Sequence, residues 1–203
     1  MPDSAGSITI DGKELCRIDR SSLRRCIIAV PQHVVLLPDG TSLKTNLDPF
    51  DTATDCECRG ALDCVGLRQL IDECGGLAGP LSADVLSQGQ KQLFSLARAI
   101  LRRKVRSRGA AASNRPDGGI LLLDELNSGV DHDTDRAMQR LIQEEFEGYT
   151  VVAVSHRLET VMHFDTVVVM DKGRLIEIGN PRNLAQQDGS HFKELWAMEK
   201  KTG

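Results

Sequence analysis

The sequence has 203 residues, a mass of 22.2 kDa and a formal net charge of -4, with 40% hydrophobic and 27% charged residues. This is the composition of a globular chain with enough apolar residues for one core, and it excludes an intrinsically disordered protein. The negative charge argues against general nucleic-acid binding, which needs a broad excess of Lys and Arg. No apolar run approaches the roughly 20 residues that span a bilayer, and the polar start MPDSAGS does not resemble a signal peptide. We therefore expect a chain that is itself soluble and cytosolic, with no nucleic-acid partner.

Two local features admit more than one interpretation. The basic run RRKVRSR, residues 102–108, is compatible with a lipid or nucleic-acid contact, but we interpret it as a solvated surface loop. The six cysteines show neither a Cys-x-x-Cys pair nor a histidine at a matching offset. This spacing indicates free thiols in a reducing compartment rather than disulfides or a zinc site.

The first part of the chain predicts a hairpin, a buried strand and a helical region. Alternating apolar residues lead into Asp11 and Gly12, the usual signal for a hairpin turn. The apolar run Cys26–Val30 is stopped by Pro31, which predicts a buried strand that ends in a loop. Residues 40–101 are interpreted as a small helical subdomain that ends in a clearer helix.

That clearer helix is the stretch LSQGQKQLFSLARAIL, residues 86–101. Ser87 and Gln90 form the Ser-x-x-Gln pattern of a capping box, whose side chains satisfy N–H groups of the first turn. Gly89 lies between them, where a missing side chain lets another molecule approach the backbone. An apolar stripe follows at helical spacing: Leu93, Leu96, Ala97, Ile100 and Leu101. Because helix N-termini attract anions, this start is suited to a phosphate.

The second part alternates apolar strands with amphipathic helices. ILLLDE (120–125) and TVVAVSH (150–156) are strands with polar ends. The helix between them has an apolar face and a stop at Gly148; the face consists of Met138, Leu141, Ile142 and Phe146. Two more strands meet at residues 171–173, and SHFKELWAMEKK closes the chain as a helix. The fold class is therefore α/β, a parallel sheet with helices on both faces and an antiparallel opening.

Three strand ends carry polar side chains that suit one reaction: Gln32, then Asp124 with Glu125, then His156. An acid at such an edge can hold Mg²⁺ through water, and a neighbouring carboxylate can orient or deprotonate an attacking water. A glutamine can bridge metal and water, and a histidine can hydrogen-bond a terminal phosphate. A hydrolase pair at Ser155 and His156 is excluded, since adjacent strand residues point to opposite faces. The set predicts nucleotide hydrolysis.

Four motifs resemble, in order, those of ABC-type ATPase domains. LSQGQ with KQLFSLARAIL resembles the signature motif, ILLLDE the Walker B strand, SGVD the D-loop and VSHRLE the switch histidine. GSITIDGKEL, LRRCIIAVPQHVVLL, TNLDPF and DKGRLIEIGNP narrow the resemblance to the second nucleotide-binding domain of C-subfamily, multidrug-resistance-associated exporters. It covers nearly the whole chain and implies a P-loop NTPase-like fold. It also implies ATP and Mg²⁺ as ligands, and ATP hydrolysis that drives the export of organic anions or drugs.

The resemblance also implies a role for each matching residue. Glu125 is the catalytic carboxylate, assisted by Gln32 of the Q-loop and His156 of the switch. Asp124 is the magnesium acid, with Gln32 as a further ligand. The implied ATP contacts are Ser87, Gly89, Gln90 and Asp131. DELNSGVD stands where the family more often has DEATSSVD, a departure that bears on the D-loop contacts.

The family's phosphate loop, G-x-x-x-x-G-K-[ST], has no counterpart in these residues. Gly12 and Lys13 are followed by Glu and lie in a hairpin turn, so they cannot serve as that loop. In dimers of such domains each ATP lies between the P-loop of one domain and the signature helix of the other. The implied partners are a second ABC ATPase domain and the transmembrane domains of an exporter, which puts the chain at the cytoplasmic face of a membrane.

We interpret residues 1–203 as a single ABC-type ATPase domain without the Walker A strand and loop, inactive alone and active within a longer exporter. Two alternatives stay open. A short non-catalytic partner could offer its signature helix to another ATPase domain, and an assay of that domain's turnover would reveal it. A truncated product without function would aggregate, since losing a central strand leaves unpaired backbone and apolar surface.

Overall fold

The computed structural model describes residues 7–112, 118–125 and 130–202, in two compact units, Met1–Ala153 and Val154–Gly203. The strands are β1 (Thr9–Ile10), β2 (Lys13–Glu14), β3 (Ile27–Val30), β4 (Gly119–Asp124), β5 (Tyr149–Val154), β6 (Val167–Asp171) and β7 (Arg174–Gly179). The helices are α1 (Arg20–Cys26), α2 (Leu43–Leu47), α3 (Asp55–Cys64), α4 (Arg68–Glu73), α5 (Gln88–Ala112), α6 (His132–Glu145), α7 (Leu158–Val161), α8 (Pro181–Leu184) and α9 (His191–Thr202). Short 3₁₀ turns occupy Leu15–Arg17 and Ala83–Val85. The predicted α/β class with an antiparallel opening is confirmed.

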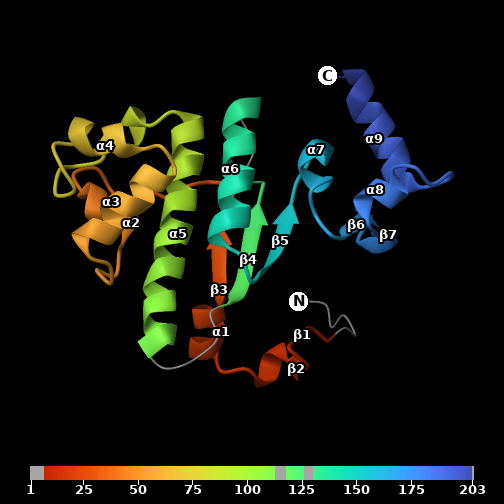
Figure 1. Ribbon diagram of the computed structural model, residues 1–203, viewed down its shortest axis with the longest axis horizontal. Helices are drawn as coiled ribbons and strands as arrows, with labels where there is room; N and C mark the ends of the chain where they lie inside the picture. The colour runs from red at the N-terminus through yellow and green to blue at the C-terminus, as the bar shows by residue number, and fades with distance from the viewer. Residues whose placement is uncertain (1–6, 113–117, 126–129, 203) are drawn as a thin grey trace. The chain divides into compact units, whose positions relative to one another are not determined.

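The main sheet of the first unit has the strand order β3-β4-β5, and the three arrows point the same way (Figure 1). β3 and β4 are parallel, with Ile28 opposite Leu121 and Val30 opposite Leu123. These four side chains are buried on one face of the sheet. The predicted buried strand before Pro31 is thus confirmed, and it starts at Ile27.

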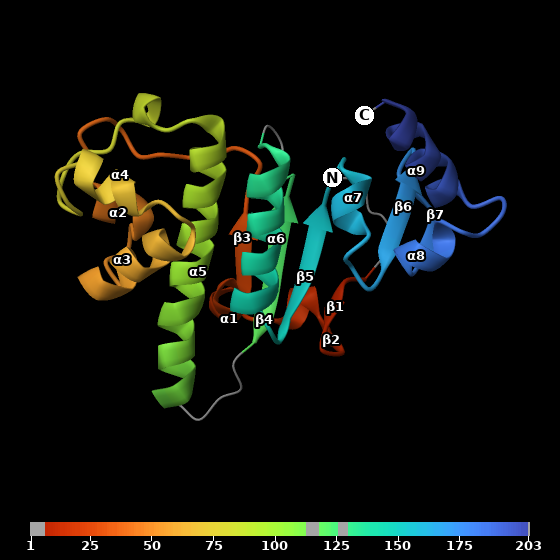
Figure 2. The same ribbon diagram turned by 45° about the horizontal axis from the view of Figure 1, so that its top comes forward.

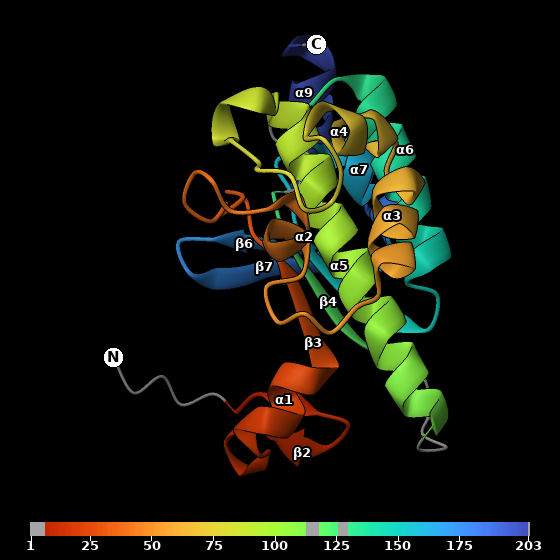
Figure 3. The same cartoon turned by 90° about the vertical axis from the view of Figure 1, so that its left-hand side faces the viewer.

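The covered face of the sheet carries α5 and α6, which lie on the same side of β3 and β4 (Figure 3). The apolar stripe predicted for α5 is confirmed, since Leu96, Ala97, Ile100 and Leu101 are all buried in the core. Met138 and Phe146, which belong to the predicted face of the second amphipathic helix, are buried in the same core. Gly148 has a φ of 81°, a left-handed conformation that suits the predicted helix stop.

The opposite face of the sheet is not covered by the described residues of the first unit. Val152 and Val154 of β5 are 51% and 57% exposed, and Leu122 of β4 is 36% exposed. The apolar composition of β4 and β5 led us to expect helices on both faces, and the described residues of the first unit place helices on one of them. A continuous apolar strand predicts that both faces of the sheet are buried, but it does not show which part of the protein covers the second face.

The basic run RRKVRSR was wrongly interpreted as a loop, because residues 102–108 continue α5. Arg and Lys are good helix formers, and basic side chains of residues 102–108 form ion pairs with acidic residues on two other helices. Arg103 Nη2 lies 2.7 Å from Glu145 Oε2 of α6, and Arg108 Nη1 lies 2.9 Å from Glu57 Oε1 of α3. These ion pairs and good helix propensity support the longer helix.

The region of residues 40–101 contains α2, α3 and α4, which gather beside α5 away from β5 (Figure 2). A capping box starts α3, since Glu57 N donates to Thr54 Oγ1 while Thr54 N donates to Glu57 Oε2. Helices thus occupy the region predicted to be helical. Its status as a separate subdomain stays a prediction.

The second unit is built on the antiparallel pair β6 and β7, joined at Lys172 and Gly173 as the sequence indicates. Glu177 of β7 accepts hydrogen bonds from Ser190 Oγ and from Phe192 N, both at 2.9 Å, and so fixes the start of α9. Phe192, in the first turn of α9, is buried. Among the described helices of either unit, none has the length and apolar content to cross a bilayer.

Candidate functional site

The carboxyl edge of β3 and β4 brings two of the predicted site residues together. Because Val30 lies opposite Leu123 in a parallel register, the chain positions that follow, Gln32 and Glu125, emerge side by side. Gln32 Nε2 donates a hydrogen bond to Glu125 Oε2, and both side chains are half-buried. The geometry pairs an amide with a carboxylate at the edge where ligands of parallel sheets bind.

Glu125 adopts an unusual backbone conformation. Its φ is 47°, in the left-handed region that a residue other than glycine adopts at an energetic cost. The chain therefore turns sharply at the end of β4. The preceding residue, Asp124, ends the strand with an exposed carboxylate.

The carboxyl edge of β4 offers oxygen atoms of the kind that Mg²⁺ prefers. Within residues 7–112, 118–125 and 130–202, no cluster of three or more His, Cys, Asp or Glu side chains could hold a metal ion by itself. Mg²⁺ commonly binds through one or two protein oxygen ligands together with waters and phosphate oxygens. Asp124 and the amide oxygen of Gln32 are oxygen donors of that kind.

The start of α5 carries the capping box that the sequence predicts. Ser87 N donates to Gln90 Oε1 at 2.9 Å, and Gln90 N donates to Ser87 Oγ at 3.2 Å. Each bond satisfies one N–H group that the first turn leaves without an intrahelical partner. The cap fixes the direction of a 25-residue helix whose N-terminal end attracts anions.

Among the described residues, nothing in the packing requires a glycine at position 89. A Cβ added there would lie 3.7 Å from Val130 Cγ1, which is an ordinary van der Waals contact. Glycine in a helix costs about 1 kcal/mol relative to alanine. The described residues thus give no reason for a glycine that lowers helix stability at this position. A close approach by another molecule, which a side chain would block, gives such a reason.

Asp131 begins α6 as its N-cap residue. Its Oδ1 accepts from Asp133 N at 3.0 Å and from Thr134 N at 2.9 Å, and its Oδ2 accepts from Thr134 Oγ1 at 2.7 Å. The bonds from Thr134 are the main reason that the pKa of Asp131 lies below its usual value. The structure gives this carboxylate a capping role, and its contact with ATP stays a prediction.

His156 follows β5 in the second unit, where its side chain is exposed. It lines a hollow of about 420 Å³ with Ser155, Phe192 and Glu199. Ser155 Oγ accepts from Arg157 N at 3.0 Å and donates to Arg157 O at 3.2 Å, so it serves a local turn. The position of His156 relative to Gln32 and Glu125 stays a prediction.

Sequence reasoning missed Gln92, a buried residue of α5. Its Nε2 donates to the backbone oxygen of Gln32 at 2.8 Å, so it contacts the predicted site directly. The signal was available in the sequence, because position 92 lies one helical turn before Leu96 on the apolar stripe. A polar side chain at a core position requires an explanation.

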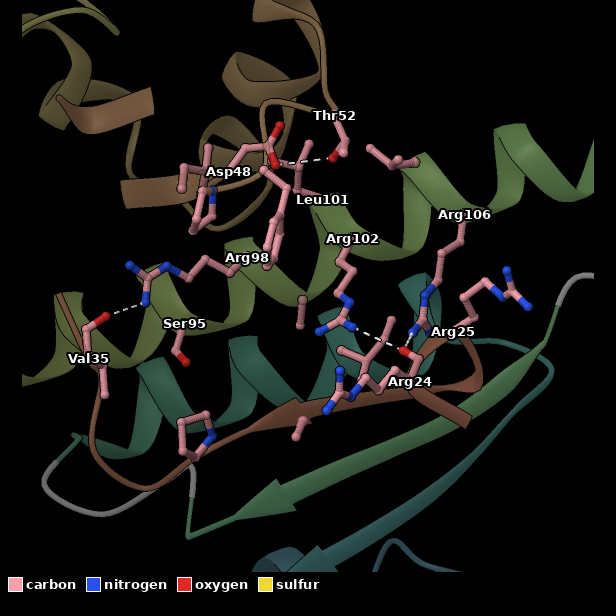
Figure 4. Close-up of a pocket in the computed structure, with 18 of the residues that line it drawn as sticks. Arg24, Arg25, Val35, Asp48, Thr52, Ser95, Arg98, Leu101, Arg102 and Arg106 are labelled. Atoms are coloured by element: carbon pink, nitrogen blue, oxygen red, sulfur yellow. Dashed lines mark hydrogen bonds between the residues drawn. The ribbon is translucent and has the colours of Figure 1, made fainter. Parts of the chain in front are cut away.

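Arg98 of α5 was also missed. Its Nη1 donates to Val35 O and its Nε to Asn46 O, both at 2.7 Å, and burial lowers its pKa to about 10. It borders a cavity of about 540 Å³ between α5, β3 and the segment that follows β3 (Figure 4). Arg24 and Arg102 line the same cavity, where Arg102 Nη2 donates to Arg24 O at 3.1 Å.

These features define an α/β domain of the nucleotide-binding kind found in ABC exporters. A bacterial Atm1-family ABC exporter with ATP bound has a similar fold, with a TM-score of 0.78 and 28% sequence identity. The similarity covers 96% of this chain and 32% of the exporter chain.

Residues 1–105 match the family described as ABC transporter, and the chain belongs to that family. It is 52% identical to "ABC transporter FGM5" of Gibberella zeae over 202 residues, which cover 99% of this chain and 14% of that protein. It is 42% identical to "ABC multidrug transporter B" of Aspergillus fumigatus over 194 residues, which cover 96% of this chain and 12% of that protein. The chain thus spans about one seventh to one eighth of the length of these relatives.

Proposed function

We propose that these residues form the catalytic strand edge and the signature helix of an ATP-hydrolysing domain, whose turnover drives export across a membrane. The observation that supports this proposal is the hydrogen bond between Gln32 and Glu125 at the carboxyl edge of β3 and β4. A carboxylate and an amide held together at this edge can share one water molecule and one cation.

In this proposal Glu125 orients the attacking water and accepts its proton. Gln32 donates through Nε2 to Glu125, which leaves its amide oxygen to face that water or the metal ion. Asp124 binds Mg²⁺ through water with its exposed carboxylate, and His156 donates to the terminal phosphate. Mg²⁺, when bound, neutralises the charge that develops on the phosphate oxygens.

The start of α5 faces the phosphates of a nucleotide that a second ATPase domain holds. Ser87, Gly89 and Gln90 supply this surface, and the open space that an added Cβ at Gly89 meets among the described residues supports this. Asp131 lies next to Val130, the residue nearest to an added Cβ at Gly89, and completes the same surface. The 203 residues contain no phosphate-binding glycine loop, so we propose that this loop belongs to a segment outside them.

The finer identity that we propose is the second ATPase domain of a C-subfamily, multidrug-resistance-associated exporter. The motifs TNLDPF and DKGRLIEIGNP support it, as does the similarity to a protein named as a multidrug transporter. Its partners are then a second ATPase domain and transmembrane domains, its substrates are organic anions or drugs, and it works at the cytoplasmic face of a membrane.

The test is Glu125→Gln in the full-length protein that contains this chain. We expect steady-state ATP hydrolysis to fall by about 10²-fold or more, because the catalytic carboxylate is lost, while ATP binding is retained. The exposed Glu147, on the turn after α6, provides the control substitution Glu147→Gln, which leaves turnover unchanged.

Undiminished hydrolysis in the Glu125→Gln protein would overturn the catalytic assignment. It would favour a chain that only offers its signature helix in trans, since that role needs Gly89 but not Glu125.

A further inference from the structure

We propose that Gln92 is a positioning residue, which holds the main chain of Gln32 and so sets the contact between Gln32 and Glu125. This inference rests on the proposed function, because it concerns how that site is held in place. The Gln92 side chain is 0% exposed, and its Nε2 donates to Gln32 O at 2.8 Å.

The orientation of the Gln92 amide follows from its partner. A backbone carbonyl can only accept a hydrogen bond, so the amide must turn its nitrogen toward Gln32 and its oxygen away. That oxygen is buried and meets no donor among the described residues. A buried polar atom without a partner lowers stability, whereas an apolar side chain of similar length would avoid this cost. Packing alone therefore does not account for a glutamine at position 92.

The hydrogen bond joins two parts of the proposed site through one helix. Gln92 lies two positions after Gln90, whose side chain caps the start of α5. Through Gln32 it reaches Glu125, at the carboxyl edge of β4. A shift of the helix start relative to the sheet would therefore move Gln32 and change its bond to Glu125.

Arg98 gives a second tie between α5 and the segment after β3, at a different place. It donates to Val35 O, a bond drawn in Figure 4, and to Asn46 O. These bonds hold the far part of the segment and do not reach Gln32. Gln92 therefore holds the main chain at Gln32, a different point of the segment from those held by Arg98.

The test compares Gln92→Met with Ser95→Ala in the full-length protein. Methionine keeps the length and approximate volume of glutamine but cannot donate, whereas Ser95→Ala removes another buried polar group from the same helix. For Gln92→Met we expect kcat for ATP hydrolysis to fall about tenfold while KM for ATP changes little, because a catalytic group is displaced. We also expect faster hydrogen exchange in a peptide covering residues 27–37, and neither change in Ser95→Ala.

A double-mutant cycle tests whether Gln92 acts through Gln32. If it does, Gln92→Met causes no further loss of kcat in a Gln32→Ala protein. Equal behaviour of Gln92→Met and Ser95→Ala, or additive losses in the cycle, would overturn the proposal. A wild-type protein that does not hydrolyse ATP would instead contradict the proposed function. The exchange comparison would still decide whether Gln92 holds the Gln32 main chain.

Discussion

The side chains of Gln32 and Glu125 are joined by a hydrogen bond although the residues lie 93 positions apart in the chain. Each follows a buried strand, and the parallel register of β3 and β4 makes them neighbours. Neither side chain alone distinguishes a reactive edge from an ordinary strand exit into solvent. Their contact is what makes the carboxyl edge of the sheet a candidate site.

Two glycines of α5 allow a matched test of the signature helix. Alanine at either Gly89 or Gly109 meets no close neighbour among the described residues, so each substitution should raise helix stability, by up to about 1 kcal/mol. Only Gly89→Ala should lower ATP hydrolysis, because its methyl group occupies the surface that we propose faces a phosphate. Turnover and thermal midpoints of the two variants check this. Equal turnover in both would refute the role of Gly89.

The ion pair between Arg103 and Glu145 should matter for stability. Its side chains are 21% and 19% exposed, and the closest nitrogen and oxygen lie 2.7 Å apart. Removing Arg103 leaves the Glu145 carboxylate with Lys104, 3.5 Å away, as its remaining cation, so we expect Arg103→Ala to cost about 1–2 kcal/mol.

An exposed ion pair provides the control for that measurement. Arg68 is 80% exposed and lies 3.5 Å from Asp63, so Arg68→Ala should cost less than about 0.5 kcal/mol. Chemical denaturation of the nucleotide-binding domain measures both changes. A similar loss of unfolding free energy in the two variants would contradict a structural role for the basic residues 102–108 of α5.

Two cysteines of α3 should differ sharply in reactivity. Burial raises the pKa of Cys58 from 9.0 to about 11, whereas Cys56 is exposed. At pH 8 only about 0.1% of Cys58 is thiolate, so alkylation should label Cys56 rapidly and Cys58 only after unfolding. The stability linked to this buried thiol is complete below pH 9.0 and is lost as the pH rises toward 11. Mass spectrometry of alkylated peptides checks the order; rapid labelling of Cys58 would contradict its burial.

The exposed apolar side chains on one face of the main sheet should make the isolated 203 residues prone to aggregate. Val152 and Val154 expose apolar surface on β5, a strand at the edge of its sheet. We expect the isolated chain to aggregate or to bind a hydrophobic dye, and replacing both valines with threonine to reduce this. A soluble monomer with a cooperative thermal transition and no dye binding would show that this face needs no cover.

Local signals in the sequence were sufficient for most elements of the fold. The turn at Asp11 and Gly12, the capping box at Ser87 and the helix stop at Gly148 each depend on backbone chemistry within a few residues. The basic run of residues 102–108 was wrongly predicted to be a loop because its acidic partners, Glu57 and Glu145, lie far away in the sequence.

The candidate site was only partly predictable. The contact between Gln32 and Glu125 follows from strand ends and parallel order, which the sequence indicates. Gln92 was missed because a hydrogen bond to a backbone oxygen carries no pattern beyond one polar residue on an apolar stripe. The role of His156 stays a prediction, because local sequence patterns do not show which side chains act together with it.

We propose that these residues work within a longer membrane exporter. An antibody against α9 (His191–Thr202), applied to separated membrane and soluble fractions, tests it most directly by giving the mass of the native polypeptide. We predict a band in the membrane fraction several times larger than 22.2 kDa, because the chain spans 14% of the relative named ABC transporter FGM5. A soluble band at 22.2 kDa would contradict the claim.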